Sequence, residues 1–121
     1  MDARDVATRF NQAINDRDLE SLAALMTDDF RFVDAAGTAF EGKERGRDIW
    51  RQFFDGFPDY RNHFETLAEV DGTVVITGRS TCSDPRLEGR ALWTARIEGS
   101  KVREWCVYED SPEQRAALDM A

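Results

Sequence analysis

The residues with the clearest chemical potential lie near the end of a short predicted strand. Phe30, Phe32 and Asp34 alternate with Arg31 and Val33, so the aspartate is expected to face the same interior as the two phenylalanines. A carboxyl group in an apolar interior is desolvated, and this brings a general base closer to neutral pH. Asp34 is therefore the candidate catalytic base. The alternative is that Asp34 caps the turn that follows it, a common role of aspartate.

Two basic side chains are further candidates. Arg79 shares a strand face with Thr77 and Thr81. If that face is inward, the guanidinium could pair with Asp34 or bind a substrate carboxylate or enolate; if it is outward, Arg79 is one of many solvated arginines. His63 is the only histidine and could act as a general acid or base, although a lone histidine on a strand is more often structural.

Other kinds of site find no support in the sequence. One histidine and two well-separated cysteines, Cys82 and Cys106, do not form a metal-ligand pattern, and no glycine-rich phosphate loop is present. We therefore expect no metal and no cofactor. The two cysteines are expected to be buried thiols in a reducing cytoplasm.

Helices are expected to position these residues in the first half of the chain. Apolar residues recur every four positions in the first helix, and a second, short helix follows the N-cap candidate Asp18. A third helix is expected to follow Gly42 and to end at Gly56, a suitable C-cap residue, because Pro58 prevents its continuation. The buried faces of the three helices are expected to comprise Val6, Phe10 and Ile14; Leu22, Leu25 and Met26; and Ile49, Trp50, Phe53, Phe54 and Phe57.

Strands dominate the second half. Runs at 60–70, 73–82, 88–98 and 101–109 read as consecutive strands, and Asp71-Gly72 is a strong hairpin signal between the first two. The facing of 60–70 is unclear because its apolar residues do not hold a period of two. A short helix is expected after Ser111-Pro112. Helices followed by antiparallel strands predict an α+β fold in which one curved sheet packs its concave side against the helices.

Length and charge bound the function. A chain of 121 residues is one domain, 1–121, and its 16 basic against 24 acidic residues give a net charge of −8. So acidic a domain is a poor partner for nucleic acid or an anionic membrane. No apolar run reaches the ~20 residues of a membrane helix, and the charged N-terminus lacks the apolar stretch of a secretory signal, so a cytoplasmic protein is expected.

The segments MTDDFRFVDAAG and FEGKERGRDIWRQFF resemble the SnoaL-like and ketosteroid-isomerase-like branch of the nuclear transport factor 2-like superfamily, and DGTVVITGRS and KVREWCVYED fit its closing strands. The resemblance implies a cystatin-like cone: a curved antiparallel sheet wrapped around the N-terminal helices, with an apolar pocket inside. It also implies a homodimer paired through the outer face of the sheet, where Cys106 and Tyr108 are expected. This fold carries isomerases, cyclases, epoxide hydrolases and plain binding modules.

The resemblance to ketosteroid isomerase is incomplete. Asp34 falls on the position of that family's general base, but the two oxyanion-binding positions read as Phe10 and Trp93. Phe10 has no donor, and Trp93 has one indole N–H. Loss of one oxyanion donor typically costs ~100–1,000-fold in turnover, so the chain is not expected to be a true ketosteroid isomerase.

The limonene-epoxide-hydrolase pattern is also incomplete. Arg79 matches its arginine and Trp105 a pocket tryptophan, but its two acids are replaced by Thr81 and Val107. This absence argues against that activity. The SnoaL-type cyclases use an aspartate with a histidine nearby, for which Asp34, Asp110 and His63 are available.

We therefore expect a SnoaL-like pocket protein that works as a cofactor-independent enzyme. The reaction would be proton transfer, of the isomerase, cyclase or lyase type, on a small apolar substrate that bears a carbonyl group. Asp34 would be the base, with Trp93 and Arg79 as polar partners. The alternative is a non-catalytic module that binds a small hydrophobic molecule or mediates dimerisation. The predicted substrate-binding residues are Phe10, Ile14, Phe30, Phe32, Trp50, Phe53, Phe54, Arg79, Trp93 and Trp105.

Overall fold

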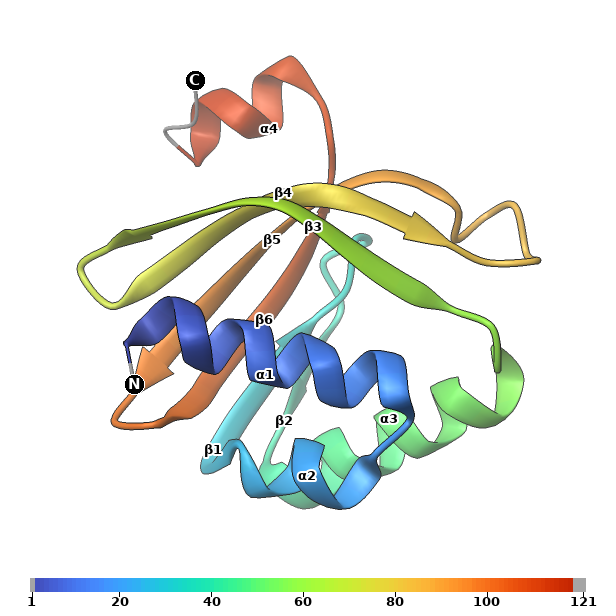
Figure 1. Ribbon diagram of the computed structural model, residues 1–121, viewed down its shortest axis with the longest axis vertical. Coiled ribbons are helices and arrows are strands. Elements are labelled where there is room, and N and C mark those ends of the chain that lie inside the picture. Colours follow the sequence, from blue (N-terminus) through green and yellow to red (C-terminus); the bar gives the residue numbers. More distant parts are fainter. Residues whose placement is uncertain (1, 119–121) are drawn as a thin grey trace.

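Helices and strands of the computed structural model, which describes residues 2–118, form a curved sheet with three helices on its concave side (Figure 1). The helices are α1 (Ala3–Asp16), α2 (Leu19–Ala24), α3 (Lys43–Gly56) and α4 (Pro112–Ala117). The strands are β1 (Met26–Val33), β2 (Ala39–Glu41), β3 (Arg61–Val70), β4 (Thr73–Thr81), β5 (Gly89–Glu98) and β6 (Lys101–Glu109). The expected α+β class is confirmed.

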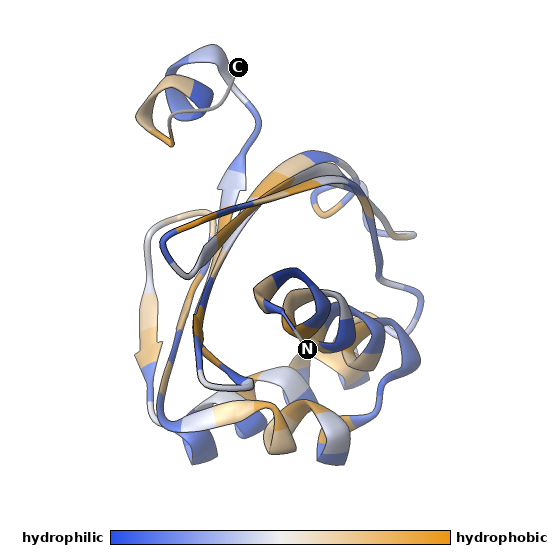
Figure 2. Ribbon diagram, turned by 60° about the vertical axis from the view of Figure 1, so that its left-hand side comes forward, coloured by the Kyte–Doolittle hydropathy of each residue, from blue (hydrophilic) through white to orange (hydrophobic). Residues whose placement is uncertain are grey.

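The sheet has the strand order β2-β1-β6-β5-β4-β3 and bends around α1, while α4 stands on the outer, convex side (Figure 2). The strands β3 to β6 form an antiparallel meander, with its first turn at Asp71-Gly72 as expected; both turn residues have positive φ angles, 52° and 83°. Helix α1 packs against all four strands of the meander. The concave face is thereby covered, as the helical stripes predict.

Two features of the sheet differ from the expectation. The sheet is mixed rather than wholly antiparallel, because β1 pairs in parallel with β6. A short strand that was not expected, β2, pairs with β1 after the turn at Gly37. In addition, Met26 begins β1 instead of ending the second helix. The periodicity of apolar residues indicates which face of a strand is buried, but it does not indicate which strand lies beside it. The parallel pairing of β1 with β6 could therefore not be predicted from either segment.

Aspartates begin the first two helices. The carboxylates of Asp2 and Asp5 each accept a hydrogen bond from the other's backbone N–H, at 3.0 and 3.2 Å, which forms a capping box at the start of α1. Asp18 caps α2 as predicted, accepting from the backbone N–H of Ser21 at 3.1 Å. Arg17, between the two helices, adopts the left-handed conformation with φ of 57° and turns the chain.

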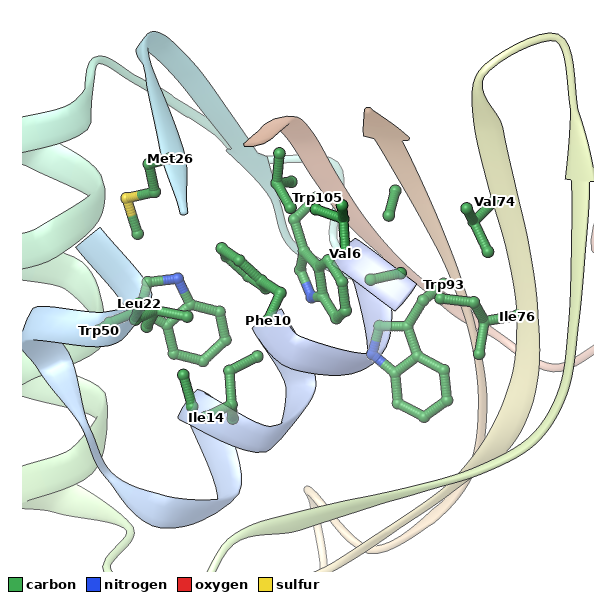
Figure 3. Close-up of a cluster of buried hydrophobic side chains, with 14 of the residues drawn as sticks. Val6, Phe10, Ile14, Leu22, Met26, Trp50, Val74, Ile76, Trp93 and Trp105 are labelled. Atoms are coloured by element: carbon green, nitrogen blue, oxygen red, sulfur yellow. The ribbon is translucent and has the colours of Figure 1, made fainter. Parts of the chain in front are cut away.

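The hydrophobic core lies between α1, α3 and the sheet (Figure 3). Phe10 is at its centre, with ring centroids at 5.9 Å from Phe30, 6.5 Å from Trp50 and 4.7 Å from Trp105. Helix α3 approaches β1 at Gly46, where a Cβ atom would lie 2.7 Å from the ring of Phe30. Because Gly46 has no side chain, α3 can lie close to β1, and the aromatic residues of α3 pack against that strand.

Candidate functional site

A cavity of about 150 Å³ lies beside this core, between α3 and the inner face of the sheet. Its walls are mostly aromatic or aliphatic, and its polar side chains are an aspartate, a tyrosine and an asparagine. The lining residues are Phe32, Asp34, Ala35, Ile49, Trp50, Phe53, Tyr60, Asn62, Leu87, Trp93, Trp105 and Val107. We take this cavity as the candidate functional site.

The structure divides the predicted pocket residues into two groups. Asp34, Phe32, Trp50, Phe53, Trp93 and Trp105 line the cavity, and Val107 joins Trp105 on the inner face. The others do not line it. Phe10, Ile14 and Phe30 are fully buried and form part of the core itself. Phe54 packs on Trp50, with ring centroids 5.8 Å apart, and beneath the guanidinium of Arg17. The apolar faces of the helices thus form mainly the core, and among the predicted helical residues only those of α3 line the cavity.

Asp34 is half-buried and has two roles in the geometry. Its Oδ1 accepts hydrogen bonds from the backbone N–H groups of Ala36 and Thr38, both at 3.0 Å, so the side chain does cap the turn between β1 and β2. It also lines the cavity. Within residues 2–118, Oδ2 accepts no hydrogen bond. The turn therefore fixes one carboxylate oxygen and leaves the other available to a ligand.

A polar group that the sequence did not indicate lies in the same wall. The side chain of Asn62 is buried, and its Oδ1 accepts a hydrogen bond from Ser80 Oγ at 2.8 Å. Ser80 Oγ in turn lies 3.1 Å from the Tyr60 hydroxyl. Because the serine hydroxyl has one proton and gives it to Asn62, Tyr60 is the donor to Ser80. The result is a chain of oriented hydrogen bonds from Tyr60 through Ser80 to Asn62.

Helix α1 fixes the backbone of Asn62. Asn15 Oδ1 accepts from the Asn62 backbone N–H at 2.8 Å, and Asn15 Nδ2 donates to the Asn62 carbonyl oxygen at 2.9 Å. In the described part of the chain, Asn62 Nδ2 has no other hydrogen-bond acceptor, but the side chain lies within hydrogen-bonding reach of the Tyr60 hydroxyl, where it opposes the rise in the pKa of Tyr60. Burial nevertheless raises the pKa of Tyr60, which keeps its hydroxyl protonated as a donor. Because Asn62 Nδ2 carries two N–H groups, one donor remains for a ligand even when the other is directed at the Tyr60 hydroxyl.

The tryptophans contribute surface rather than polar contacts. Trp50, Trp93 and Trp105 all line the cavity, but each indole Nε1 is sealed from solvent and has no hydrogen-bond partner in residues 2–118. An acceptor could reach these N–H groups only if the rings moved. Trp93, expected to be a polar partner, is therefore an apolar wall in this structure.

The basic candidates lie on the outer face. Along β4 the inward positions are Val74, Ile76, Gly78 and Ser80, so Arg79 points outward and is exposed. His63 is also exposed, and its Nε2 lies 3.1 Å from Thr81 Oγ1 on that outer face. Neither side chain lines the cavity. The interpretation of Arg79 as a substrate-binding residue is therefore not carried into the candidate site.

Asp110, the third acidic candidate, is engaged elsewhere. Its carboxylate accepts from Arg115 at 2.7 Å and from Arg90 at 3.2 Å, beyond the end of β6. The hydrogen bond with Arg115 is the main reason that its pKa falls to about 2. Asp34 is consequently the carboxylate that this fold brings to the cavity.

The described residues contain neither a cluster of metal ligands nor a helix suited to crossing a membrane. Among residues 2–118, no three His, Cys, Asp or Glu side chains gather closely enough to hold a metal ion. None of the helices in that range has the length and apolar character needed to cross a bilayer. Cys82 and Cys106 are both buried free thiols, as expected.

Comparison with solved structures confirms the fold. A nuclear transport factor 2-like protein of unknown function from Cytophaga hutchinsonii superposes with a TM-score of 0.76 at 16% identity, over 98% of this chain and 96% of that one. A protein from Sinorhizobium meliloti, provisionally named a polyketide cyclase, gives 0.78 at 11% identity, over 88% and 99%. One from Kribbella flavida, provisionally named a ketosteroid isomerase, gives 0.73 at 17% identity, over 96% and 86%.

These identities are low, so the structural likeness establishes architecture and leaves the chemistry open. No functionally curated protein matches the sequence. The SnoaL-like domain profile, in contrast, matches residues 7–105, which include both strands and helices that line the cavity. The chain belongs to the SnoaL-like domain family, on the nuclear transport factor 2-like fold.

Proposed function

We propose that this chain is a cofactor-independent enzyme that moves a proton within a small, mostly apolar substrate bearing a carbonyl group. The observation that carries the proposal is the position of Asp34, whose carboxylate lines an aromatic cavity with one oxygen held by the turn and the other free. A base fixed in this way meets its substrate without a further loss of side-chain freedom. Membership of a family whose structural relatives carry cyclase and isomerase names supports the proposal.

The proton transfer would proceed in two steps. Asp34 Oδ2 removes a proton from the carbon next to the substrate carbonyl. The C–H electron pair forms a C=C bond to the carbonyl carbon, and the C=O π pair moves to the oxygen, which gives an enolate. Asp34 then returns the proton to another carbon, or to the same one, and the carbonyl forms again. Isomerisation, ring closure and elimination of a β-substituent share the first step. The enolate oxygen needs a hydrogen-bond donor.

Asn62 would donate the hydrogen bond that Phe10 cannot donate and that the Trp93 indole, sealed from solvent, does not offer to a ligand. Its Nδ2 is the donor that remains once Oδ1 is bound by Ser80 and the backbone by Asn15. The chain from Tyr60 holds the amide in one orientation, and successive hydrogen bonds polarise one another. The expected polar partner of Asp34 is therefore Asn62 rather than Trp93 or Arg79.

Exchange of carbon-bound protons tests this proposal without knowledge of the natural substrate. Cyclohexanone in D₂O would lose its α-protons faster with the protein than without it, followed by proton NMR. Asp34→Asn should reduce the catalysed rate by about 100- to 10,000-fold. Asp55→Asn, which changes an exposed aspartate of α3 outside the cavity, is the matched control and should leave the rate unchanged.

The alternative, a binding module for a small hydrophobic molecule, has its own support. Asp34 already caps a turn, and the cavity walls are mainly apolar. If the same ketone binds but its α-protons exchange at the background rate with wild type and with Asp34→Asn alike, the enzyme proposal fails and the binding module remains.

A homodimer through the outer face of the sheet is part of the proposal. Its support is a second cavity of about 650 Å³ between that face and α4, beside Val70, which is a large apolar side chain with 61% exposure. Cys106, which is expected on that face, is only 5% exposed without any partner, so it is no argument for dimerisation. Sedimentation at micromolar concentration should give a species of twice 13.8 kDa, and a 13.8 kDa species alone would contradict the dimer.

A further inference from the structure

We propose that the cavity accepts substrates no larger than a single six-membered ring with its carbonyl group, and that Leu87 sets this limit at the rim. As a statement about substrates, the inference rests on the proposed function; as a statement about what binds, it stands on the cavity alone.

The volume admits one ring. Pockets for drug-sized ligands enclose about 300–1,000 Å³, whereas this cavity measures about 150 Å³. An apolar cavity of about 150 Å³ in another protein holds one benzene molecule. A fused system of two or four rings therefore exceeds the space. The polar groups, Asp34 and Asn62, suit a carbonyl group and its neighbouring carbon on that single ring.

The walls resist enlargement because the lining tryptophans belong to the core. Trp93 and Trp105 are fully buried, and Trp50 is 4% exposed. Phe64 ties two of them together, with ring centroids 5.1 Å from Trp93 and 6.1 Å from Trp105. Figure 3 shows Trp105 beside Phe10, and Trp93 farther along the sheet beside Ile76. Moving such rings outward would force side chains and backbone out of their positions in a close-packed interior.

Phe32 and Phe53 hold Trp50 from either side, with ring centroids at 5.4 and 5.7 Å and near-perpendicular planes. Edge-to-face contacts of this kind stabilise a pair of rings beyond the effect of the buried area alone. The wall formed by α3 is therefore fixed in the same way as the wall formed by the sheet.

Leu87 is a lining side chain that packs against the edge of the core but is not enclosed by it. It is half-buried and lies in the connection between β4 and β5, outside the helices and strands. Its backbone N–H donates to the carbonyl oxygen of Asp84 at 3.0 Å. Arg86 binds the Asp84 carboxylate at 2.6 Å, which folds the loop on itself. The loop therefore places Leu87 where its side chain meets both the cavity and the edge of the core.

The start of the same loop is tied to the wall of the cavity. Asp59, next to Tyr60, accepts a hydrogen bond from the Ser83 backbone N–H at 2.9 Å. In Figure 1 this loop and the junction of α3 with β3 lie on the same side of the molecule. Removing the Leu87 side chain would then open space at the rim and leave the loop anchored at Asp59 and Asp84.

Binding of three enones of increasing size tests the limit. The probes are cyclohex-2-enone, a two-ring fused enone and a four-ring steroid enone. All three tryptophans of the chain line the cavity, so quenching of indole fluorescence reports on occupancy directly. Wild type should bind the one-ring enone at least about tenfold more tightly than the two-ring enone, the scale on which pocket size discriminates. It should bind the steroid enone not at all.

Two leucine variants assign the limit to Leu87. Leu87→Ala should improve binding of the two-ring enone by about tenfold. Leu67→Ala removes the same atoms from another half-buried leucine that packs on the core but does not line the cavity, and it should leave the order of affinities unchanged. Tight binding of the steroid enone by wild type, an unchanged order in Leu87→Ala, or binding of none of the probes would overturn the inference.

The same measurements separate this inference from the proposed function. Asp34→Asn keeps the cavity and should keep the order of affinities, whether or not the protein is an enzyme. If the one-ring enone binds in that order but ketone protons do not exchange, the size limit stands and the enzyme proposal fails. If protons exchange in large ketones as fast as in small ones, the enzyme proposal stands and the size limit fails.

Discussion

Ser80 Oγ donates a hydrogen bond of 2.8 Å to Asn62 Oδ1, and this contact joins β4 to β3 inside the domain. Both side chains are buried, with exposures of 4% and 2%. With Oδ1 bound in this way, Nδ2 is the end of the Asn62 side chain that can donate to a ligand. One serine on a neighbouring strand thus determines which end of the asparagine a ligand would meet.

Ser80→Ala should lower the free energy of unfolding by about 1–3 kcal/mol, because the variant leaves Tyr60 O–H and Asn62 Oδ1 buried with no partner from Ser80. Urea denaturation would measure the change. Ser100→Ala, in the exposed turn between β5 and β6, is the control and should alter stability by less than about 0.5 kcal/mol. An equally small effect of Ser80→Ala would mean that the hydrogen-bond chain carries little energy.

Asp34→Asn and Asp34→Ala should differ in stability even if both abolish proton transfer. An asparagine Oδ1 can still accept from the backbone N–H groups of Ala36 and Thr38, so the turn keeps its cap. Alanine removes the acceptor, and such losses cost about 0.5–2 kcal/mol at comparable caps. Thermal unfolding of the two variants would measure this difference in stability. Equal melting temperatures would indicate that the turn does not need its cap.

The facing of β3 could not be predicted because the strand contains a bulge. Tyr60, Asn62 and Phe64 face inward at a spacing of two, and then the register with β4 shifts between Phe64 and Thr66. After the shift Leu67 is the next residue that packs on the core. A bulge reverses the alternation of faces, so no single period fits the strand. The polar pair Tyr60 and Asn62 was missed for this reason.

The aromatic part of the site was easier to predict. Trp50 and Phe53 lie on the helical stripe of α3, and Trp105 has the parity of Val107 on β6, so periodicity alone places them inside. Periodicity does not distinguish a residue that fills the core from one that borders an empty space. Phe10 and Ile14 were therefore counted as pocket residues although they are fully buried in packing contacts.

Gly78→Ala should be strongly destabilising, because a Cβ atom at this position would collide with the backbone carbonyl oxygen of His63 on β3. Relief requires the two strands to separate locally, and overpacking of this kind typically costs about 1–3 kcal/mol or more. Gly56→Ala, where a Cβ atom meets nothing within 4 Å, is the matched control and should be neutral or slightly stabilising. Chemical denaturation would measure the free energy of unfolding of both variants. If Gly78→Ala left that free energy unchanged, β3 would be able to move away from β4 at little cost.

The attachment of α4 should depend on pH through Asp110. Its side chain is 10% exposed and binds Arg115 and Arg90, and these contacts lower its pKa from 3.8 to about 2. A carboxyl group with a lower pKa in the folded state stabilises that state fully above the unfolded value of about 3.8. This contribution is lost as the pH falls through about 2. The protection factors of the α4 amides, which correct for the intrinsic pH dependence of exchange, should therefore fall across that range.

Asp110→Asn should reproduce the loss at neutral pH, because an amide cannot form the ion pairs with Arg115 and Arg90. The expected result is faster amide exchange confined to α4, with the exchange of the sheet unchanged. Glu109→Gln, which alters an exposed carboxylate one residue earlier, is the control and should leave α4 as it is. If Asp110→Asn left α4 protected at pH 7, the helix would be held by apolar contacts with the outer face of the sheet. The titration at low pH would then have to be ascribed to unfolding of the whole domain.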